Sequence, residues 1–281
     1  MRLVRSYAIL VAFCAMLEGC GMNTRKQFIR EGFGLAAIVA TQTAPAILVR
    51  SMCAARNGIA AAKRGGGWVN PYVTNGLVAT WDGEWNAGWG VHDANATVWK
   101  DLVGTRDATL SGSFAWGSNY WHVESVSGRG LATWPAQNLG SDQTIEFVIS
   151  AGATSGYGRI IAEGQNVAAP IARTNGPYLY GYGIDRGITL SDYVMDYMHV
   201  HQIVHPSGGP LYYYIDGALV WTEPGATSDS TGATSGYFAN RADLQRGLDA
   251  KYYSVRLYSR ALTAAEIAAN YAVDKARFNL L

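Results

Sequence analysis

The sequence predicts an all-β domain, a sandwich of antiparallel sheets closed by one short C-terminal helix, behind an N-terminal helical or export segment. Short apolar or alternating runs recur between turn-forming residues, with no helical runs between them. Asp216-Gly217 stands between two strand-like runs, which is a type I′ hairpin signal. Near the C-terminus, Thr263 and Glu266 have the spacing of a capping box, which predicts a helix start.

The composition favours a large folded core and excludes a nucleic-acid partner. The 281 residues are 49% hydrophobic and only 15% charged, with nine Trp and seventeen Tyr, so most of the chain is not disordered. Residues 1–64 carry nine basic against two acidic residues, which leaves a net charge of −6 on the remainder. A nucleic-acid binder needs a basic folded body. All three cysteines lie at or before Cys53, so nothing later can form a disulfide.

Residues 1–53 are typical of an export signal and N-terminal hydrophobic segment. The first twenty residues have a positive start, an apolar run and a Leu17-Glu-Gly-Cys20 ending similar to a lipoprotein cleavage site. A second signal begins at Met22, where Thr24–Arg30 resembles a twin-arginine motif with Lys in place of the second Arg. Either methionine could be the true start. The alternative is an N-terminal helix that stays on the mature protein, and membrane contact is expected only through such an anchor.

A linker is expected at 54–70, because this stretch ends in a run of three glycines. The folded domain is then 71–281. Its clearest predicted strands are Gly76–Trp81, Thr144–Ser150, Arg159–Ala162 and Leu211–Ile215. In the terminal helix Ile267, Tyr271 and Phe278 share one face, which we expect to dock on the sandwich.

Several segments then carry a family resemblance. The first of these segments is Trp99-Lys-Asp-Leu-Val-Gly104, which is followed by Asp107-Ala-Thr-Leu110. The other segments are Thr144–Val148, His199–Val204 with Tyr213–Gly217, and Tyr253–Ile267. In this order they resemble the laminin G-like domains of the concanavalin A-like lectin/glucanase superfamily, with Met198 where Trp is usual. The resemblance covers about residues 76–278 and implies a jelly-roll sandwich of two antiparallel sheets, one of them concave. A fold does not give a function.

A glycosidase is the first activity to weigh. Retaining enzymes need two carboxyl groups about 5–5.5 Å apart, and the glucanases of this fold carry a Glu-x-Asp-x-(x)-Glu motif that this sequence lacks. The nearest pattern is Asp82-Gly-Glu84, which also fits two solvated acids at a strand end, and Glu146 has no carboxylate two residues away. We therefore expect no catalytic residues, with a glycosidase or sialidase-like enzyme as the third alternative.

Metal and cofactor signals are weak. His199, His201 and His205 would share one side of a strand and could ligate a transition metal, or they are ordinary strand and turn residues. The chain has no nucleophile elbow, phosphate loop or dinucleotide fingerprint, so no cofactor is required. Calcium is a possible addition through rim oxygens of Asp93, Asn95 and Asp101, with Asp229 as a further donor.

Aromatic clusters are the main functional signal. Sugar rings stack their C–H faces on Trp and Tyr, while their hydroxyls need fixed polar partners. The candidate carbohydrate-binding residues are Trp85, Trp89, Trp116, Trp121, Tyr178, Tyr180 and Tyr182. The alternative for each ring is a place in the core.

The leading hypothesis is thus an exported, non-enzymatic carbohydrate-binding or adhesive module whose partner is a glycan or glycosylated surface. The second is a structural or protein-interaction module of a cell surface or phage particle, which would bind a host-surface or particle protein. The expected location is the cell surface or the extracellular space, or the virion if the gene belongs to a phage. Burial of the four tryptophans would favour the second hypothesis.

Overall fold

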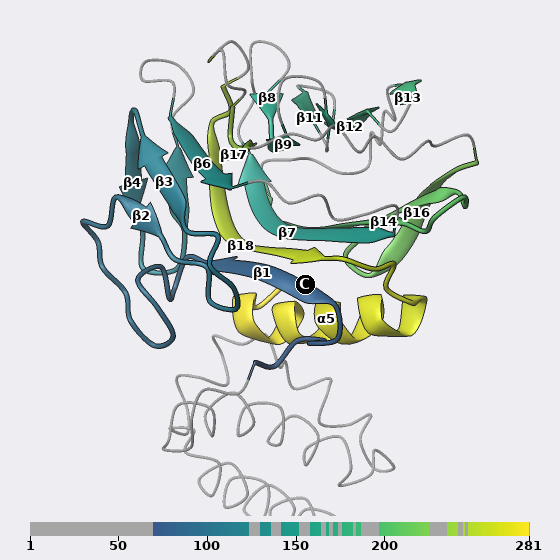
Figure 1. Ribbon diagram of the computed structural model, residues 1–281, viewed down its shortest axis with the longest axis horizontal. Coiled ribbons are helices and arrows are strands. Elements are labelled where there is room, and N and C mark those ends of the chain that lie inside the picture. The colour runs from purple at the N-terminus through teal and green to yellow at the C-terminus, as the bar shows by residue number, and fades with distance from the viewer. Residues whose placement is uncertain are drawn as a thin grey trace, which may run out of the picture. The chain divides into compact units, whose positions relative to one another are not determined.

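In the described part of the chain, strands form three antiparallel sheets and one helix lies against the largest (Figure 1). The computed structural model describes residues 70–123, 130–135, 142–151, 158–163, 167–168, 171–173, 176–181, 184–186, 197–224, 235–240, 244 and 247–280. These residues belong to one compact unit, Trp68–Leu281. The predicted export segment and nearly all of the predicted linker lie outside the described residues. None of the described helices is long and apolar enough to span a bilayer.

The largest sheet has eight strands, with β18 near its middle. Seven of them are, in spatial order, β16 (Ala218–Glu223), β15 (Leu211–Ile215), β14 (His199–His205), β7 (Gln143–Ala151), β18 (Ala250–Tyr258), β5 (Trp121–Val123) and β4 (Phe114–Trp116), and the eighth pairs with β18 beside this path. Two strands share one edge of β18. Its first residues pair with β5, and its last residues pair with β1 (Leu77–Asp82). The long β7 lines its other edge.

The second sheet has six strands and the third has four. The six are β10 (Val167–Ala168), β9 (Ile161–Glu163), β17 (Ser235–Phe238), β6 (Leu131–Pro135), β3 (Ala108–Ser111) and β2 (Val98–Trp99). The four are β13 (Ile184–Arg186), β12 (Gly176–Gly181), β11 (Ile171–Arg173) and β8 (Gly158–Arg159). The strand predicted at Arg159–Ala162 is divided at Ile160, whose carbonyl oxygen accepts hydrogen bonds from the Ala239 N–H and the Tyr252 hydroxyl.

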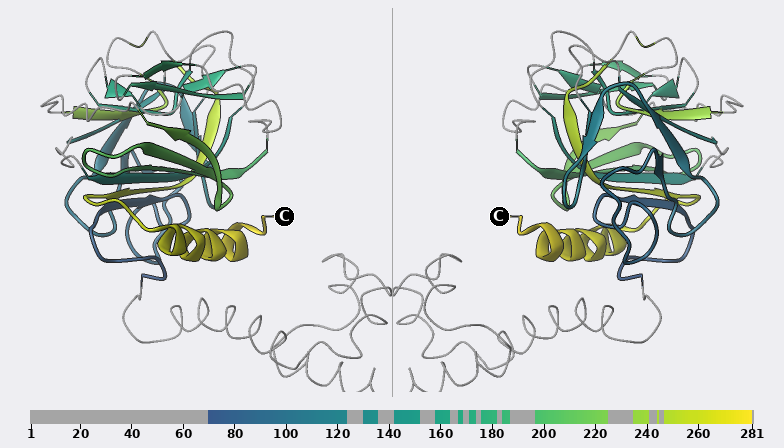
Figure 2. Two further views of the ribbon diagram at one scale, coloured as in Figure 1. Left: turned by 90° about the vertical axis from the view of Figure 1, so that its right-hand side faces the viewer. Right: turned by 90° about the vertical axis from the view of Figure 1, so that its left-hand side faces the viewer.

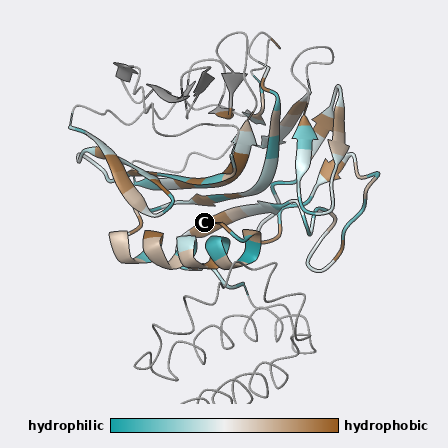
Figure 3. Cartoon of the chain, turned by 180° about the vertical axis from the view of Figure 1, so that it is seen from behind, coloured by the Kyte–Doolittle hydropathy of each residue, from teal (hydrophilic) through white to brown (hydrophobic). Residues whose placement is uncertain are grey.

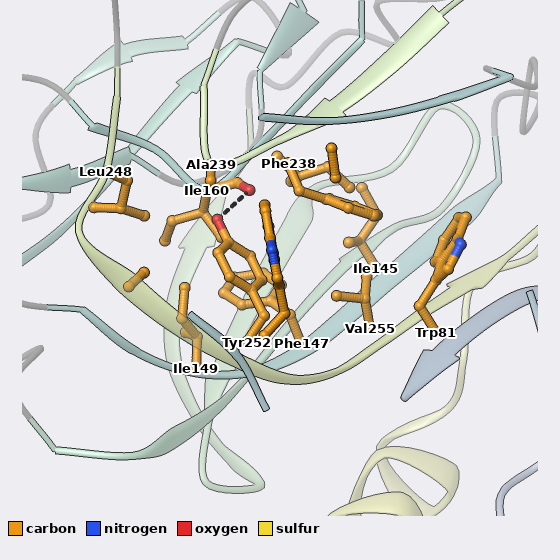
Figure 4. Close-up of a cluster of buried hydrophobic side chains, with 14 of the residues drawn as sticks. Trp81, Ile145, Phe147, Ile149, Ile160, Phe238, Ala239, Leu248, Tyr252 and Val255 are labelled. Atoms are coloured by element: carbon orange, nitrogen blue, oxygen red, sulfur yellow. Dashed lines mark hydrogen bonds between the residues drawn. The ribbon is translucent and has the colours of Figure 1, made fainter. Parts of the chain in front are cut away.

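The main core lies between the eight-stranded and six-stranded sheets. On β7 the residues Ile145, Phe147 and Ile149 alternate into it (Figure 4), and alternating hydropathy is visible along the strands in Figure 3. Tyr252 faces this core and the next residue, Tyr253, packs on the opposite side of the sheet; a bulge after Tyr252 then shifts the alternation, so that Val255 also faces the core. The alternation therefore gives the large sheet an inner face and an outer face.

The helix α5 (Ala264–Phe278) covers the outer face (Figure 2). It begins with the predicted capping box, in which the Thr263 hydroxyl accepts from the Glu266 N–H and the Glu266 side chain accepts from the Thr263 N–H. It ends at Asn279, which adopts the left-handed conformation with φ 54°. Ile267 is fully buried against the sheet. The all-β sandwich with one short C-terminal helix is confirmed.

The predicted hairpin joins β15 to β16. Asp216 and Gly217 have φ values of 51° and 75°, and a type I′ turn requires positive φ at both central residues. The ring of Tyr271 on α5 lies against Gly217, where an added Cβ would come 2.8 Å from Tyr271 Cδ1. The glycine is thus needed for its conformation and for the close approach of the helix.

A buried polar network joins α5 to the sheet. Glu146 on β7 accepts hydrogen bonds from Arg256, Gln202 and Asn270 at 2.7–2.8 Å. Arg256 also binds Asp274 on α5. Burial raises the pKa of Glu146, and the nearby Arg256 guanidinium opposes that rise.

Candidate functional site

The candidate site lies in the loop that follows β1. Gly88 and Gly90, with φ values of 132° and 75°, flank Trp89 in a tight turn. The turn is closed by the Val91 N–H, which donates to the Gly88 carbonyl oxygen at 2.9 Å. Only glycine adopts such φ values without strain, so this sequence presents Trp89 at a loop tip.

Four tryptophans fasten the loops at this end of the domain through their indole N–H groups. Each donates to a main-chain carbonyl oxygen at 2.7–3.0 Å, and the pairs are Trp81 with Arg106, Trp89 with Leu102, Trp99 with Asp82 and Trp116 with Ala96. A buried carbonyl without a partner costs about 1–3 kcal/mol, so these bonds stabilise segments that have few strand hydrogen bonds of their own. The same bonds fix the orientation of each ring.

Two of these rings reach the surface, and polar side chains of the loop that holds Trp89 are exposed as well. Trp89 and Trp116 are half-buried, and His92, Asp93 and Asn95 are exposed. We call these five residues the tryptophan rim. The His92 ring meets Trp116 edge-on, with centroids 6.4 Å apart.

The polar members of the rim are held in place. His92 Nδ1 lies 3.1 Å from the Gly83 carbonyl oxygen. A carbonyl only accepts, so we infer that Nδ1 carries the proton and that Nε2 of the neutral ring is an acceptor. The fully buried Asn86 exchanges two 2.8 Å hydrogen bonds with the main chain of Asp93, and Asp93 Oδ1 accepts from the Asn95 N–H at 2.8 Å.

Trp85 and Trp121 do not belong to the rim, which corrects the prediction for both. Trp121 is 0% exposed and packs between Trp99 and Tyr252, with centroids 5.9 and 5.3 Å away. Trp85 is 6% exposed, and its ring centroid lies 5.2 Å from that of Trp89. The Arg277 guanidinium carbon lies over the Trp85 ring, 4.5 Å from its centroid. In both cases packing partners occupy the ring faces that a sugar would need.

The predicted tyrosine row falls mostly outside the described side chains. Tyr178 and Tyr180 occupy alternate positions of β12, opposite Ile171 and Asp185. Strand alternation places these two positions on one face of the sheet. Tyr182 lies outside the described residues. The sugar-binding role of this row stays a prediction.

Asp101, predicted as a calcium ligand, organises a loop instead. Its Oδ1 accepts from the N–H groups of Thr80 and Val103, and its Oδ2 accepts from the N–H of Arg106, all at 3.0–3.1 Å. An added Cβ at Gly104 would lie 2.7 Å from Asp101 Oδ2. The Asp107 carboxylate in turn accepts from the Asp101 N–H at 3.0 Å. These contacts explain the spacing of the W-x-D-x-x-G and D-x-x-L segments.

The other predicted calcium donors differ in position. Asp93 and Asn95 are exposed on the rim, where a calcium role stays a prediction. Asp229 lies outside the described residues. Within the described ranges, no three His, Cys, Asp or Glu side chains gather as a metal site.

The carboxylates considered for hydrolysis belong to ion pairs. Arg277 Nη1 lies 2.8 Å from Asp82 Oδ2, and Arg277 Nη2 lies 3.4 Å from Glu84 Oε2. Asp82 is 1% exposed. Glu146 is enclosed by Arg256, Gln202 and Asn270. These ion pairs attach α5 to the rest of the domain, which gives these acids a structural role.

The three histidines of β14 differ in their hydrogen-bond partners and burial. His199 Nδ1 lies 2.7 Å from Asp216 Oδ2. His201 is fully buried, stacks on Phe147 at 5.0 Å and lies 2.6 Å from the Tyr213 hydroxyl. Burial lowers the pKa of His201 to about 3. His205 is buried at the other end of the strand. His199 and His201 therefore fit the alternative interpretation, in which they are ordinary strand residues, better than they fit a shared metal site.

Sequence reasoning did not include Asn86 or His92 among the site residues. The sequence signal for Asn86 was weak, because no fixed motif marks an Asn whose side chain forms hydrogen bonds with the main chain seven residues later. Their role depends on the path of the loop between Gly83 and Asp93.

Solved structures share the fold at low sequence identity. Trypanosoma rangeli sialidase matches with a TM-score of 0.57 and 15% identity over 81% of this chain and 39% of that chain. The same sialidase in complex with sialic acid matches with a TM-score of 0.56 and 14% identity. The receptor binding domain of botulinum neurotoxin C/D mosaic serotype matches with a TM-score of 0.50 and 15% identity, over 70% of this chain and 51% of that chain. The chain thus spans only two fifths to half of these proteins.

Sequence comparison assigns the family. No curated protein gives a significant match to the chain. The family model described as the concanavalin A-like lectin/glucanases superfamily, of laminin G type, matches residues 126–268, half of the chain. The match includes β7, β14, β15 and β18, which form the middle of the large sheet. The chain therefore belongs to the concanavalin A-like lectin/glucanase superfamily.

Proposed function

We propose that this protein is an exported, non-enzymatic carbohydrate-binding module, lectin-like or adhesive, that recognises a glycan or glycosylated surface at the tryptophan rim. The observation that carries the proposal is that Trp89 and Trp116 are half-buried while their indole N–H groups are bound to main-chain carbonyls. What these side chains offer to a ligand is ring surface, on which sugar C–H faces stack.

The polar part of the rim supplies the hydrogen bonds that a sugar needs. The His92 ring contacts Trp116, and the Asp93 carboxylate and the Asn95 amide are exposed in the same loop as His92. These three side chains differ in donor and acceptor character. Because Asn86 and Gly83 hold them in place, binding would order little of the loop, and a preorganised site loses less affinity to ordering.

The carboxylates support a binding role over hydrolysis. A retaining glycosidase needs one acid and one nucleophile facing the same bond, whereas Asp82, Glu84 and Glu146 pair with arginines. Sialidase structures share the fold, but the match covers 39% of their length, so their activity is not carried over. Receptor binding is named for the neurotoxin domain and fits the proposed class.

A structural or protein-interaction module of a cell surface or phage particle is the second candidate. The burial of Trp85 and Trp121 favours it, because it halves the tryptophan platform expected from the sequence. Its partner would be a host-surface or particle protein.

A glycan array with the full-length chain tests the proposal. We expect binding to a defined sugar family, lost in Trp116→Ala and kept in Tyr197→Ala, a matched aromatic truncation at a residue that is 70% exposed. Parallel arms in calcium and in EDTA test the calcium prediction at Asp93 and Asn95. Silence from a chain that circular dichroism shows to be folded would reject the lectin proposal and favour the second candidate.

Export is tested separately. Residues 1–53 fused to a reporter enzyme that is active only outside the cytoplasm should give activity, and fusions starting at Met1 and at Met22 identify the start. Activity from neither fusion would reject export.

A further inference from the structure

Two tyrosines lie side by side on the outer face of the large sheet, next to α5. Tyr212 and Tyr214 alternate on β15, so both point away from the main core. Each is half-buried and packs against the small cluster of Val204, Leu262 and Ile267. Of the three consecutive tyrosines of β15, only Tyr213 is fully buried.

The neighbouring strand β16 extends this surface. Thr222 is paired with Tyr212, and Leu219 is paired with Tyr214. Directly opposed residues on paired strands share a face. Thr222 is exposed and Leu219 is 51% exposed. We call these four residues the tyrosine platform.

The phenol groups of the platform differ from those of the interior. Among the described residues, neither Tyr212 nor Tyr214 has a hydrogen-bond partner for its hydroxyl. The hydroxyls of the buried Tyr213 and Tyr258 are engaged, by His201 at 2.6 Å and by Asn270 at 2.9 Å. Partial burial, with the neighbouring Tyr212, raises the pKa of Tyr214. That phenol is therefore neutral at physiological pH and can both donate and accept.

We propose that the tyrosine platform is a second carbohydrate-binding site, for a neutral oligosaccharide of at least two rings. Alternate residues of a strand are about 6.6 Å apart, so the two phenols form an elongated surface. Each offers a ring face for stacking and a hydroxyl for hydrogen bonding. The inference rests on the proposed carbohydrate-binding function but uses none of the residues of the tryptophan rim.

The size and polarity of the platform select this ligand over other occupants. A stable protein interface uses about 20–30 residues a side, and the platform has four. None of the four is charged, which favours an uncharged ligand. Three of the four carry hydroxyl groups, which suit sugar hydroxyls better than a hydrocarbon chain.

The test uses the full-length chain and four neutral hexasaccharides, those of cellulose, starch, laminarin and xylan, with the matching monosaccharides. Calorimetric titrations are run in a Trp116→Ala background, so that the tryptophan rim does not contribute. We expect one hexasaccharide to bind more tightly than its monosaccharide. Tyr212→Ala and Tyr214→Ala should each weaken binding about two- to tenfold, and the double variant should abolish it.

Tyr212→Phe and Tyr214→Phe keep the packing on Val204 and Ile267 and remove only the hydroxyls. They should weaken binding without lowering the melting temperature, while Tyr197→Ala should change neither. Unchanged hexasaccharide affinity in the double alanine variant would overturn the inference, as would the lack of hexasaccharide binding in the Trp116→Ala background.

The two proposals fail separately. If Trp116→Ala removes all binding seen on the glycan array, the rim stands and the platform falls. If Trp116→Ala binds every glycan as tightly as wild type and that binding depends on the tyrosines, the platform stands and the rim falls. If wild type binds no glycan of any charge, both fall.

Discussion

Arg256 and Glu146 form an ion pair that is completely shielded from solvent, with 2.8 Å between Nε and Oε2 and 0% exposure of both side chains. The same guanidinium binds Asp274 on α5 and the Ser254 hydroxyl, and its Cζ lies 3.9 Å from the centroid of the Tyr72 ring. One side chain thus connects β7, β18, the helix and the segment before β1.

Arg256→Met should therefore destabilise the domain strongly. It leaves Glu146 and Asp274 buried without their counter-charge, and breaking such a pair costs about 3–5 kcal/mol. Chemical denaturation measures the loss. The matched control is Arg260→Met, which breaks the more exposed Arg260–Glu266 pair of 2.6 Å and should cost about 1 kcal/mol or less. Equal losses in the two variants would contradict this account of the network.

His201 should make the domain less stable in mild acid. Its pKa falls from 6.5 to about 3 in the folded state because the ring is buried. Below pH 6.5 the unfolded chain binds a proton that the folded chain does not, so stability is lost at up to about 1.4 kcal/mol per pH unit. The loss continues until the folded-state pKa is reached.

Urea unfolding of wild type and His201→Phe from neutral pH to about pH 4 measures this effect. The variant should lose less stability over that range, because it has no proton to bind at this position. Parallel pH profiles for the two proteins would rule out His201 as the source of the acid sensitivity.

Trp121 and Trp116 should separate stability from binding. Trp121→Ala removes a fully buried ring and should cost about 3–5 kcal/mol, with glycan affinity unchanged under conditions where the variant is folded. Trp116→Ala removes a half-buried ring and one loop hydrogen bond, so it should cost less stability and abolish binding at the rim. Thermal melts and the glycan array give both readouts. Intact binding in folded Trp116→Ala would remove this residue from the site.

Asp101→Asn should destabilise the domain whether or not calcium is present. The amide retains only one acceptor oxygen, so at least one of the three N–H groups now bound to Asp101 loses its partner, at about 1–3 kcal/mol. Melting curves in calcium and in EDTA should show the same loss. A loss confined to the calcium samples would show that Asp101 is a ligand after all. A calcium site at Asp93 and Asn95 would instead appear as an EDTA effect on wild type.

Much of the fold could be predicted because local chemistry determines it. The hairpin at Asp216-Gly217 follows from the positive φ values that its turn demands, and the start of α5 follows from the reciprocal bonds of Thr263 and Glu266. The β7 strand follows from alternation and apolar content. The division at Ile160 could not be predicted, since it depends on the Tyr252 hydroxyl and the Ala239 N–H, which come from distant parts of the chain.

The site was harder to predict because composition does not show which ring is exposed. Trp116 and Trp121 belong to the same sequence cluster, yet Trp116 is half-buried and Trp121 fully buried. Their exposure depends on the packing of Trp99 and Tyr252, which approach from other strands. The role of Asp101 was hard to predict for a related reason. A carboxylate in a loop can bind calcium or backbone N–H groups equally well. Which of the two it binds depends on the path of the main chain, which here brings the N–H groups of Thr80 and Arg106 to Asp101.

The central place of β18 has a consequence for how the chain folds. Leu77–Asp82 pair with Ser254–Tyr258, so the first strand of the domain meets its partner only after nearly the whole chain has been synthesised. Contacts between residues so far apart in sequence slow folding. The same strand also pairs with β5 and β7, so a chain shortened before Ala250 would leave β1 without a partner and would expose one edge each of β5 and β7, and such edges are prone to aggregation. The large sheet therefore cannot be completed before Ala250–Tyr258 have been synthesised.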